Sequence, residues 1–268
     1  MKTVVVTPAG RRQYLEILSR YILNDTDVDR WDIWLNTDHQ PDIDYITRTL
    51  GTKSKVQIIR VPDPVHHPVA YRIHKFFPHA AEHDTIYVRL DDDIVHYAKG
   101  SIANIVKSRI VYNNAFLVYG NVVNSALMSH LHQRHMTIPL EWGEVKYICM
   151  DGIGWGNPHF AEKLHRLFLA DPDPTKWNVK DWLLYHYERH SINVISWLGD
   201  DCKKWCRTMN HDEEAWLSHA APLQAKRPNV ICGNSLFVHY AFYTQREYLE
   251  TTDILSLYDK LSRELTQC

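Results

Sequence analysis

The sequence predicts an α/β fold with a mostly parallel central sheet flanked by helices. Three observations support this prediction. Short apolar runs rich in β-branched and aromatic residues alternate with segments whose apolar residues recur at helical spacing. Each apolar run stops at a turn-forming or acidic cluster. Strands that alternate with helices in this way form βαβ units, whose parallel strands are covered by helices on both faces.

The first half of the chain carries four strand-like runs. Residues 4–6 are β-branched and stop at a Thr-Pro-Ala-Gly loop, after which residues 12–23 follow helical spacing. The alternation continues with predicted strands at 31–35, 56–61 and 85–90 and with helices at 43–50 and 69–81. Ligands of such sheets bind at the carboxyl ends of the strands. We therefore expect the site in the loops 7–11, 36–38, 62–65 and 91–93.

The second half is predicted from longer apolar segments. Strands are expected at 115–123, 192–198 and 230–240, and a helix-rich region is expected at 157–188. Residues 245–265 place six apolar side chains on one helical face, which predicts an amphipathic C-terminal helix. This face either docks on the same chain or forms a homodimer contact.

Composition and charge exclude several classes. The 268-residue chain has 45% hydrophobic and 23% charged residues and no low-complexity run, as in ordinary globular proteins. A formal net charge of −2 supplies no basic stripe, so we expect no nucleic-acid partner. The apolar run at 4–6 is too short for a signal peptide, and no stretch approaches the roughly 20 apolar residues that span a bilayer. We expect a cytoplasmic protein without a transmembrane segment.

Five scattered cysteines form no disulfide framework, which also fits the cytoplasm. Cys202 and Cys206, with His211 nearby, leave a zinc site as an alternative. No second matching pair is present, which favours the interpretation of buried core thiols.

An acidic triplet, Asp91, Asp92 and Asp93, directly follows the fourth apolar run. Adjacent carboxylates at a buried strand end repel one another unless a cation or hydrogen-bond donors compensate them. In an extended backbone Asp91 and Asp93 point to one side, where they could share Mn²⁺ or Mg²⁺, and Asp92 points away, towards ribose or a backbone donor. The alternative is a solvated turn or a helix N-cap, where acidic residues are ordinary.

Three segments, in this order, resemble the GT-A fold of glycosyltransferases, also called the nucleotide-diphospho-sugar transferase fold. Residues 87–93 resemble its strand-DxD element, in which aspartates hold a metal ion that bridges the donor's diphosphate. Residues 7–11 resemble its first nucleotide-contacting loop. Residues 233–240 are similar to a late strand in which many members place a further histidine ligand, here His239. Poorly characterised bacterial and large-virus members share this layout.

The resemblance spans roughly residues 3–245 and implies a domain plan. It implies one catalytic domain at 1–245, with a nucleotide-sugar-binding half at about 1–120 and an acceptor half at about 121–245, before a C-terminal helix at 246–268. The metal would be held by Asp91, Asp93 and His239. Taken alone, His239 equally fits a structural histidine.

The resemblance also implies where the nucleotide lies. Candidate contacts are Thr7, Pro8, Ala9 and Arg11 in the first loop, Asp38 after the second strand, Arg72 and Lys75 before the fourth, and Asp91 and Asp92. Guanidinium, ammonium and carboxylate groups suit phosphate, ribose and base contacts. Each charged residue is alternatively an ordinary surface charge.

Inverting members place acidic residues at the start of a late helix, where one deprotonates the acceptor hydroxyl. Asp212, Glu213 and Glu214 resemble that element, without a decision on which carboxylate acts. Asp200 and Asp201 are the competing pair, and a plain helix-dipole role is the alternative for either. Trp142, Trp155 and Trp197 are candidates for stacking on a sugar, with a core role as the default.

Together these residues predict a metal-dependent glycosyltransferase. It would move a sugar from a UDP- or GDP-linked donor to a hydroxyl of a glycan, protein or small molecule, with inversion. One alternative is a sugar-nucleotide pyrophosphorylase, although Gly10-Arg11-Arg12 is a poor version of the Gly-rich loop which that class needs. The other is a non-catalytic carbohydrate-binding protein on a GT-A fold.

Overall fold

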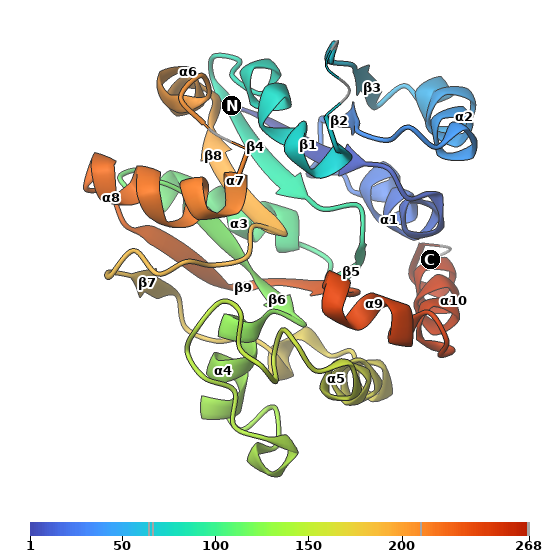
Figure 1. Cartoon of the computed structure of the whole chain (residues 1–268), viewed down its shortest axis with the longest axis vertical. Coiled ribbons are helices and arrows are strands. Elements are labelled where there is room, and N and C mark those ends of the chain that lie inside the picture. The colour runs from blue at the N-terminus through green and yellow to red at the C-terminus, as the bar shows by residue number, and fades with distance from the viewer. Residues whose placement is uncertain (64, 66, 210, 267–268) are drawn as a thin grey trace.

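The computed structural model describes residues 1–63, 65, 67–209 and 211–266. The fold is built around a nine-stranded mixed sheet with the order β3-β2-β1-β4-β8-β6-β9-β5, in which β7 also pairs with β9 (Figure 1). The strands are β1 (Lys2–Ala9), β2 (Arg30–Leu35), β3 (Val56–Ile59), β4 (Thr85–Leu90), β5 (Ile94–Tyr97), β6 (Val118–Val123), β7 (Trp182–Leu184), β8 (Val194–Leu198) and β9 (Asn229–His239).

Ten α-helices are assigned within the described residues. They are α1 (Arg12–Asn24), α2 (Gln40–Arg48), α3 (Ser101–Val111), α4 (Ala126–Arg134), α5 (Pro158–Ala170), α6 (Gly199–Trp205), α7 (Glu213–Ala215), α8 (Ala221–Ala225), α9 (Tyr243–Leu249) and α10 (Ile254–Thr266). A π-helical turn, Trp216–Ala220, joins α7 to α8, and short 3₁₀ turns include Val69–Tyr71 and Ile73–His79.

The two halves of the sheet differ in strand direction. The pairs β2–β3, β1–β2 and β1–β4 are parallel, as predicted for βαβ units. From β4 onwards the sheet is mixed, because β8 pairs antiparallel with both β4 and β6, while β6 and β9 are parallel. The carboxyl ends of β1, β2 and β4 therefore meet at one edge, next to the carboxyl end of β9.

Apolar side chains cover both faces of the sheet. One core cluster receives side chains from α1, α3, α5 and α10. The other receives them from the turn Ile73–His79, α4, α6 and the region of α8. A sheet buried on both faces explains why its strands read as apolar runs rather than as alternating patterns.

The predicted α/β class and most predicted elements are confirmed, and the strand at 85–90 matches β4 residue for residue. The expected helix at 69–81 is instead two 3₁₀ turns, and Pro78 inside the second turn lacks the amide that an α-helix interior needs. The expected helix at 245–265 is two helices, α9 and α10, separated at residues 250–253. The region 157–188 also contains the short strand β7, which three residues of pattern cannot reveal.

Three smaller expectations concern the rest of the chain. Among the residues placed by the structure, none of the helices combines the length and apolar character needed to cross a membrane. Four of the cysteines are buried free thiols, and Cys268 lies outside the described residues. The end of the expected C-terminal segment, 267–268, and residue 64 of the expected loop 62–65 also lie outside them.

Candidate active site

The acidic triplet forms a tight turn after β4 instead of an extended segment. The amide of Ile94 donates to the carbonyl of Asp91 at 3.1 Å, which closes the turn. Asp92 and Asp93 are buried, and the side chain of Asp91 is about one-fifth exposed. The expectation that Asp91 and Asp93 point to one side is therefore wrong for this backbone. The turn directs the side chains of Asp92 and Asp93 towards one group of residues and that of Asp91 towards another.

The first partner set is the Asp93 cluster, which we define as Arg11, Asp92, Asp93, His239 and Arg246. Arg11 Nε donates to Asp92 Oδ1 at 3.0 Å, and Arg11 Nη2 lies 3.1 Å from Asp93 Oδ2. Arg246 Nη2 donates to the same Asp93 oxygen at 2.8 Å, and His239 Nε2 lies 3.4 Å from it. The cluster thus joins the loop after β1, the end of β9 and α9 to the end of β4.

Backbone contacts hold this cluster in place. The amide of Gly10 donates to Asp92 Oδ2 at 3.0 Å, and the amide of Tyr240 donates to the carbonyl of Asp93 at 2.8 Å. Burial favours the neutral form of Asp93, but Arg11, His239 and Arg246 outweigh it and hold the pKa of this carboxyl well below its usual range. Asp93 is therefore a buried carboxylate compensated by two guanidinium groups.

The second partner set is the Glu213 cluster, which we define as Arg89, Tyr119, His190, Asn193 and Glu213. The guanidinium of Arg89, 3% exposed, bridges two carboxylates: its Nε donates to Asp91 Oδ1 at 2.9 Å, and its Nη1 lies 2.9 Å from Glu213 Oε1. Asn193 Nδ2 donates to Asp91 Oδ2 at 3.1 Å. The rings of Tyr119 and His190 stack at 4.8 Å between centroids.

Burial controls the protonation of this cluster. It raises the pKa of Glu213 to about 7, although Arg89 opposes the shift. It lowers the pKa of His190 to about 3, so the ring is neutral near pH 7. Glu213 Oε2, Asn193 Oδ1, the Tyr119 hydroxyl and both ring nitrogens of His190 are buried and have no hydrogen-bond partner within the described part of the chain. A carboxylate with a pKa near 7 is suited to accept and return a proton.

The neighbours of Glu213 have other tasks. Asp212 caps α7 by accepting from the amide of Ala215 at 3.1 Å. Glu214 accepts from Arg189 Nε at 2.9 Å and from the Cys149 thiol at 3.7 Å, and burial raises its pKa. Of the three predicted acidic residues, Glu213 is thus the one that the structure joins to the triplet.

The competing acidic pair has its own partners. Asp200 contacts His83 and Lys203, while Asp201 contacts Lys204 and Arg227. None of these partners belongs to the Asp93 or the Glu213 cluster.

The predicted nucleotide contacts divide into buried and exposed groups. Thr7, Pro8 and Ala9 lie inside β1, which runs further than expected, and they are buried. The Thr7 hydroxyl accepts from Trp31 Nε1 at 2.9 Å, so it faces the core and not a ligand loop.

Two of the remaining candidates, Arg72 and Lys75, are partly exposed and converge on Asp63, which the sequence did not single out. Asp38 accepts from Arg72 Nη1 at 2.9 Å. Asp63 accepts from Lys75 Nζ at 2.7 Å and lies 3.7 Å from Arg72 Nε. Its position in the loop after β3 was the available signal.

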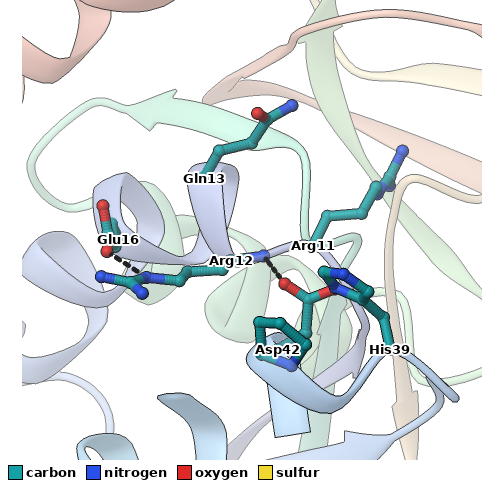
Figure 2. Close-up of a pocket in the computed structure, with 7 residues that line it drawn as sticks. Arg11, Arg12, Gln13, Glu16, His39 and Asp42 are labelled. Atoms are coloured by element: carbon teal, nitrogen blue, oxygen red, sulfur yellow. Dashed lines mark hydrogen bonds and ion pairs between the residues drawn. The ribbon is translucent and has the colours of Figure 1, made fainter. Parts of the chain in front are cut away.

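An open pocket of about 450 Å³ lies beside the first loop, between the starts of α1 and α2. It is lined by Arg11, Arg12, Gln13, Glu16, His39, Pro41 and Asp42. The amide of Arg12 donates to Asp42 at 3.0 Å, and its guanidinium donates to Glu16 at 2.6 Å. Figure 2 shows the side chains of Arg11 and Arg12 extending in different directions, so Arg11 links this pocket to the Asp93 cluster.

The expected metal ligands are not arranged as a set. His239 approaches Asp93, but Asp91 faces Arg89 and Asn193, and Asp93 is already paired with two arginines. Among the described residues, no group of three or more His, Cys, Asp or Glu side chains is placed to hold a metal ion. The residues in this arrangement therefore do not fit Mn²⁺ or Mg²⁺.

The three tryptophans proposed for sugar stacking have different positions. Trp197 is buried and stacks on Tyr87 at 5.7 Å between centroids, so it is a core residue. Trp142 is partly buried, and Lys163 Nζ lies 5.9 Å from its ring centroid. Trp155 is partly exposed and contacts the ring of Tyr243 at 5.2 Å.

Sequence reasoning missed five residues of the two clusters: Arg89, Arg246, Tyr119, His190 and Asn193. Arg89 sits inside an apolar strand, and a charged residue in such a run was the available signal. Arg246, Tyr119 and His190 carry no local signal, because only the fold brings them to the clusters.

Comparisons with known proteins bear on the fold. No family model matches the chain, and no curated protein matches it by sequence. The structure of CMP:2-keto-3-deoxy-manno-octonic acid synthetase complexed with CTP is similar over 97% of this chain and 100% of its own, with a TM-score of 0.51 and 12% identity.

A galactosyltransferase LgtC complex with donor and acceptor sugar analogs aligns over 96% of this chain and 95% of its own, with a TM-score of 0.42 and 10% identity. The synthetase similarity, which covers both chains almost completely, shows that this chain has the nucleotide-diphospho-sugar transferase fold.

Proposed function

We propose that the protein is a glycosyltransferase that moves a sugar from a nucleoside diphosphate sugar to an acceptor hydroxyl with inversion. One observation carries the proposal: the turn at 91–93 contacts both halves of the molecule. Asp92 and Asp93 contact the loop after β1 and Arg246 on α9, while Asp91 reaches Glu213 through Arg89. A donor-side group and a proton acceptor are thereby held next to one strand end, as a transfer reaction requires.

The donor half would use the loops after β1, β2 and β3. Arg11, Arg72 and Lys75 supply positive charge at these loops, and each is partly exposed. Guanidinium groups suit the oxygens of a diphosphate, and Asp38 suits the ribose or the base of a UDP- or GDP-linked donor.

The acceptor half would use Glu213 as the base. The acceptor oxygen attacks the anomeric carbon from the face opposite the diphosphate, and the bond from that carbon to the diphosphate oxygen breaks. The leaving nucleoside diphosphate takes the bonding electron pair, and Glu213 takes the acceptor's proton. Its pKa of about 7 leaves a large fraction ionised at neutral pH.

Metal dependence stays a prediction from the resemblance. The side chains of Asp91 and Asp93 pair with different arginines and do not share a site.

The first experiment is a thermal-shift screen of UDP- and GDP-linked sugars, each with and without Mn²⁺, followed by an assay for released nucleoside diphosphate. A ligand at 100 times its Kd stabilises the native state by about 2.7 kcal/mol, which corresponds to a shift on the order of 5–10 °C. A stabilising donor whose nucleoside diphosphate is released only with an acceptor would support the proposal. If no nucleotide sugar shifts the midpoint with or without Mn²⁺, the proposal is rejected.

A sugar-nucleotide pyrophosphorylase is the second candidate, because the structural similarity extends over the whole chain of a synthetase solved with CTP. The products separate the two. Pyrophosphate formed from a nucleoside triphosphate and a sugar phosphate would favour the second candidate, while sugar binding without nucleotide binding would favour a non-catalytic carbohydrate-binding protein.

A further inference from the structure

We infer that the Glu213 cluster is a binding subsite for the hydroxyl groups of a neutral sugar, and that Tyr119 and His190 are binding residues within it. The assignment of this sugar as the acceptor of the transfer rests on the proposed function, whereas sugar binding at the cluster does not. The subsite lies on the face of the sheet that carries the second core cluster, beside the irregular segment that precedes β8.

Unpartnered polar atoms carry the inference. Buried polar groups in folded proteins nearly always have a hydrogen-bond partner, because an unmade bond costs about 1–3 kcal/mol. Here four side chains of the Glu213 cluster, from β6, α7 and the segment before β8, have such atoms among the described residues. Their exposed fractions are 0% for Tyr119, 1% for His190, 7% for Asn193 and 8% for Glu213.

These side chains form one group and are not scattered. Asn193 and Glu213 are joined through Asp91 and Arg89. Tyr119 stacks on His190 and interacts electrostatically with Arg89. These contacts connect the four side chains through Arg89, and Glu213 is one of them.

The chemistry of the unpartnered atoms points to a polyol. Glu213 Oε2 and Asn193 Oδ1 accept hydrogen bonds, the hydroxyl of Tyr119 can donate, and a neutral imidazole such as His190 offers one donor and one acceptor. Sugar hydroxyls both donate and accept, so they complement this mixture. An anion would meet Asp91, Glu213 and Glu214, and an apolar ligand would leave every atom unpaired.

Partly exposed charged side chains adjoin Glu213 and His190 in the sequence. The side chains of Arg189, Asp212 and Glu214 are 36%, 48% and 28% exposed, and Arg189 pairs with both acids. The segment from Glu188 to Asn193 has no helix or strand. Because the unpartnered atoms of the Glu213 cluster are buried, we expect a sugar to reach them only when this segment moves outwards.

Tyr119→Phe and His190→Phe test the subsite. Each change keeps a flat ring and the stack but removes the unpartnered atoms. Tyr97→Phe is the matched control, because Tyr97 is a buried tyrosine in the other core cluster. The probes are methyl glycosides of glucose, galactose and mannose, with binding measured by saturation-transfer difference NMR. We expect at least one glycoside to bind the wild type and the Tyr97 variant, and to bind each test variant at least 10-fold more weakly.

A stability measurement separates binding from a structural role. Tyr119→Phe removes a hydroxyl that makes no hydrogen bond to any described residue, so its melting temperature should equal or exceed that of the wild type. The inference is overturned if no glycoside binds the wild type, or if the test variants bind as tightly as the wild type. Glycoside binding without any nucleotide-sugar shift would keep the subsite and reject the transferase. The reverse would keep the transferase and reject the subsite.

Discussion

Arg89 is a fully buried guanidinium whose two neighbours are both acids. A buried charge is tolerated when it is paired and hydrogen-bonded, and removal of one partner from such a group typically costs about 3–5 kcal/mol. Glu213 is held by Arg89 through one carboxylate oxygen, while its other oxygen is unpartnered. This asymmetry keeps the group oriented and leaves one oxygen for a substrate.

Glu213→Gln is expected to lower the turnover number by about 10²–10⁴-fold, the usual contribution of a general base. In the wild type the rate should rise as the pH passes through about 7, because burial raises the pKa of Glu213 to that value and only the ionised form accepts a proton. The variant should lack this rise. A pH profile of nucleoside diphosphate release measures both effects.

The control is Glu247→Gln, an exposed residue on α9 that should keep the wild-type profile. Stability gives a second readout of the same pKa. Because the folded pKa is raised from 4.5 to about 7, the native state holds a proton that the unfolded chain has lost, so this group's contribution to stability falls between those pH values. A Glu213→Gln enzyme with an unchanged pH profile would remove Glu213 from the mechanism.

At the scale of elements, the two C-terminal helices differ in role. Arg246 on α9 contacts Asp93, whereas α10 packs against α1 and α5 and buries Ile254 and Tyr258. Arg20 on α1 adds an ion pair of 2.7 Å to Asp259 on α10. The apolar face of α10 that the sequence predicted is thus covered at its centre by the same chain.

Tyr258→Ala should reduce the free energy of unfolding by about 3–5 kcal/mol, the range for removal of a large buried aromatic side chain. Leu265→Ala, at a site 53% exposed on the same helix, should change it by less than about 0.5 kcal/mol. Urea unfolding monitored by far-UV circular dichroism compares the two. If Tyr258→Ala lowered the free energy of unfolding as little as Leu265→Ala does, the docking of α10 would contribute little to stability.

Strands could be predicted far better than the site. β4 is a six-residue apolar run that ends at three acids, so both its ends are marked in the sequence. The prediction of a helix before β4 was wrong, because Pro78 lies inside an otherwise helical pattern of apolar residues. The orientation of Asp91 also failed, since a turn closed by one backbone hydrogen bond cannot be distinguished from an extended strand end in a sequence.

At the scale of the molecule, the sheet gathers its functional loops at one edge. The parallel pairs β1–β4 and β6–β9 have their carboxyl ends there, and the antiparallel β8 lies between these two pairs. Because each motif follows a strand whose carboxyl end lies at this edge, the order and spacing of the motifs along the chain were enough to predict the fold. The order of strands also explains why partners such as Tyr119 and Arg246, which lie on distant segments, could not be predicted.

The protein is expected to sediment as a monomer. Helix α10, whose apolar face the sequence left open to a homodimer, packs against α1 and α5 (Figure 1). Sedimentation velocity at several protein concentrations measures this. A concentration-dependent dimer that Leu265→Glu dissolves would restore the dimer interpretation of this helix.

The Asp93 cluster can be completed only late in biosynthesis. Arg11 leaves the ribosome early, but its partner Asp93 meets His239 and Arg246 only after almost the whole chain has been translated. During that interval two adjacent buried acids have one arginine between them, so nascent chains should hold the edge of the sheet loosely. If the proposed function holds, the chain would become able to engage a donor only at the end of its own synthesis.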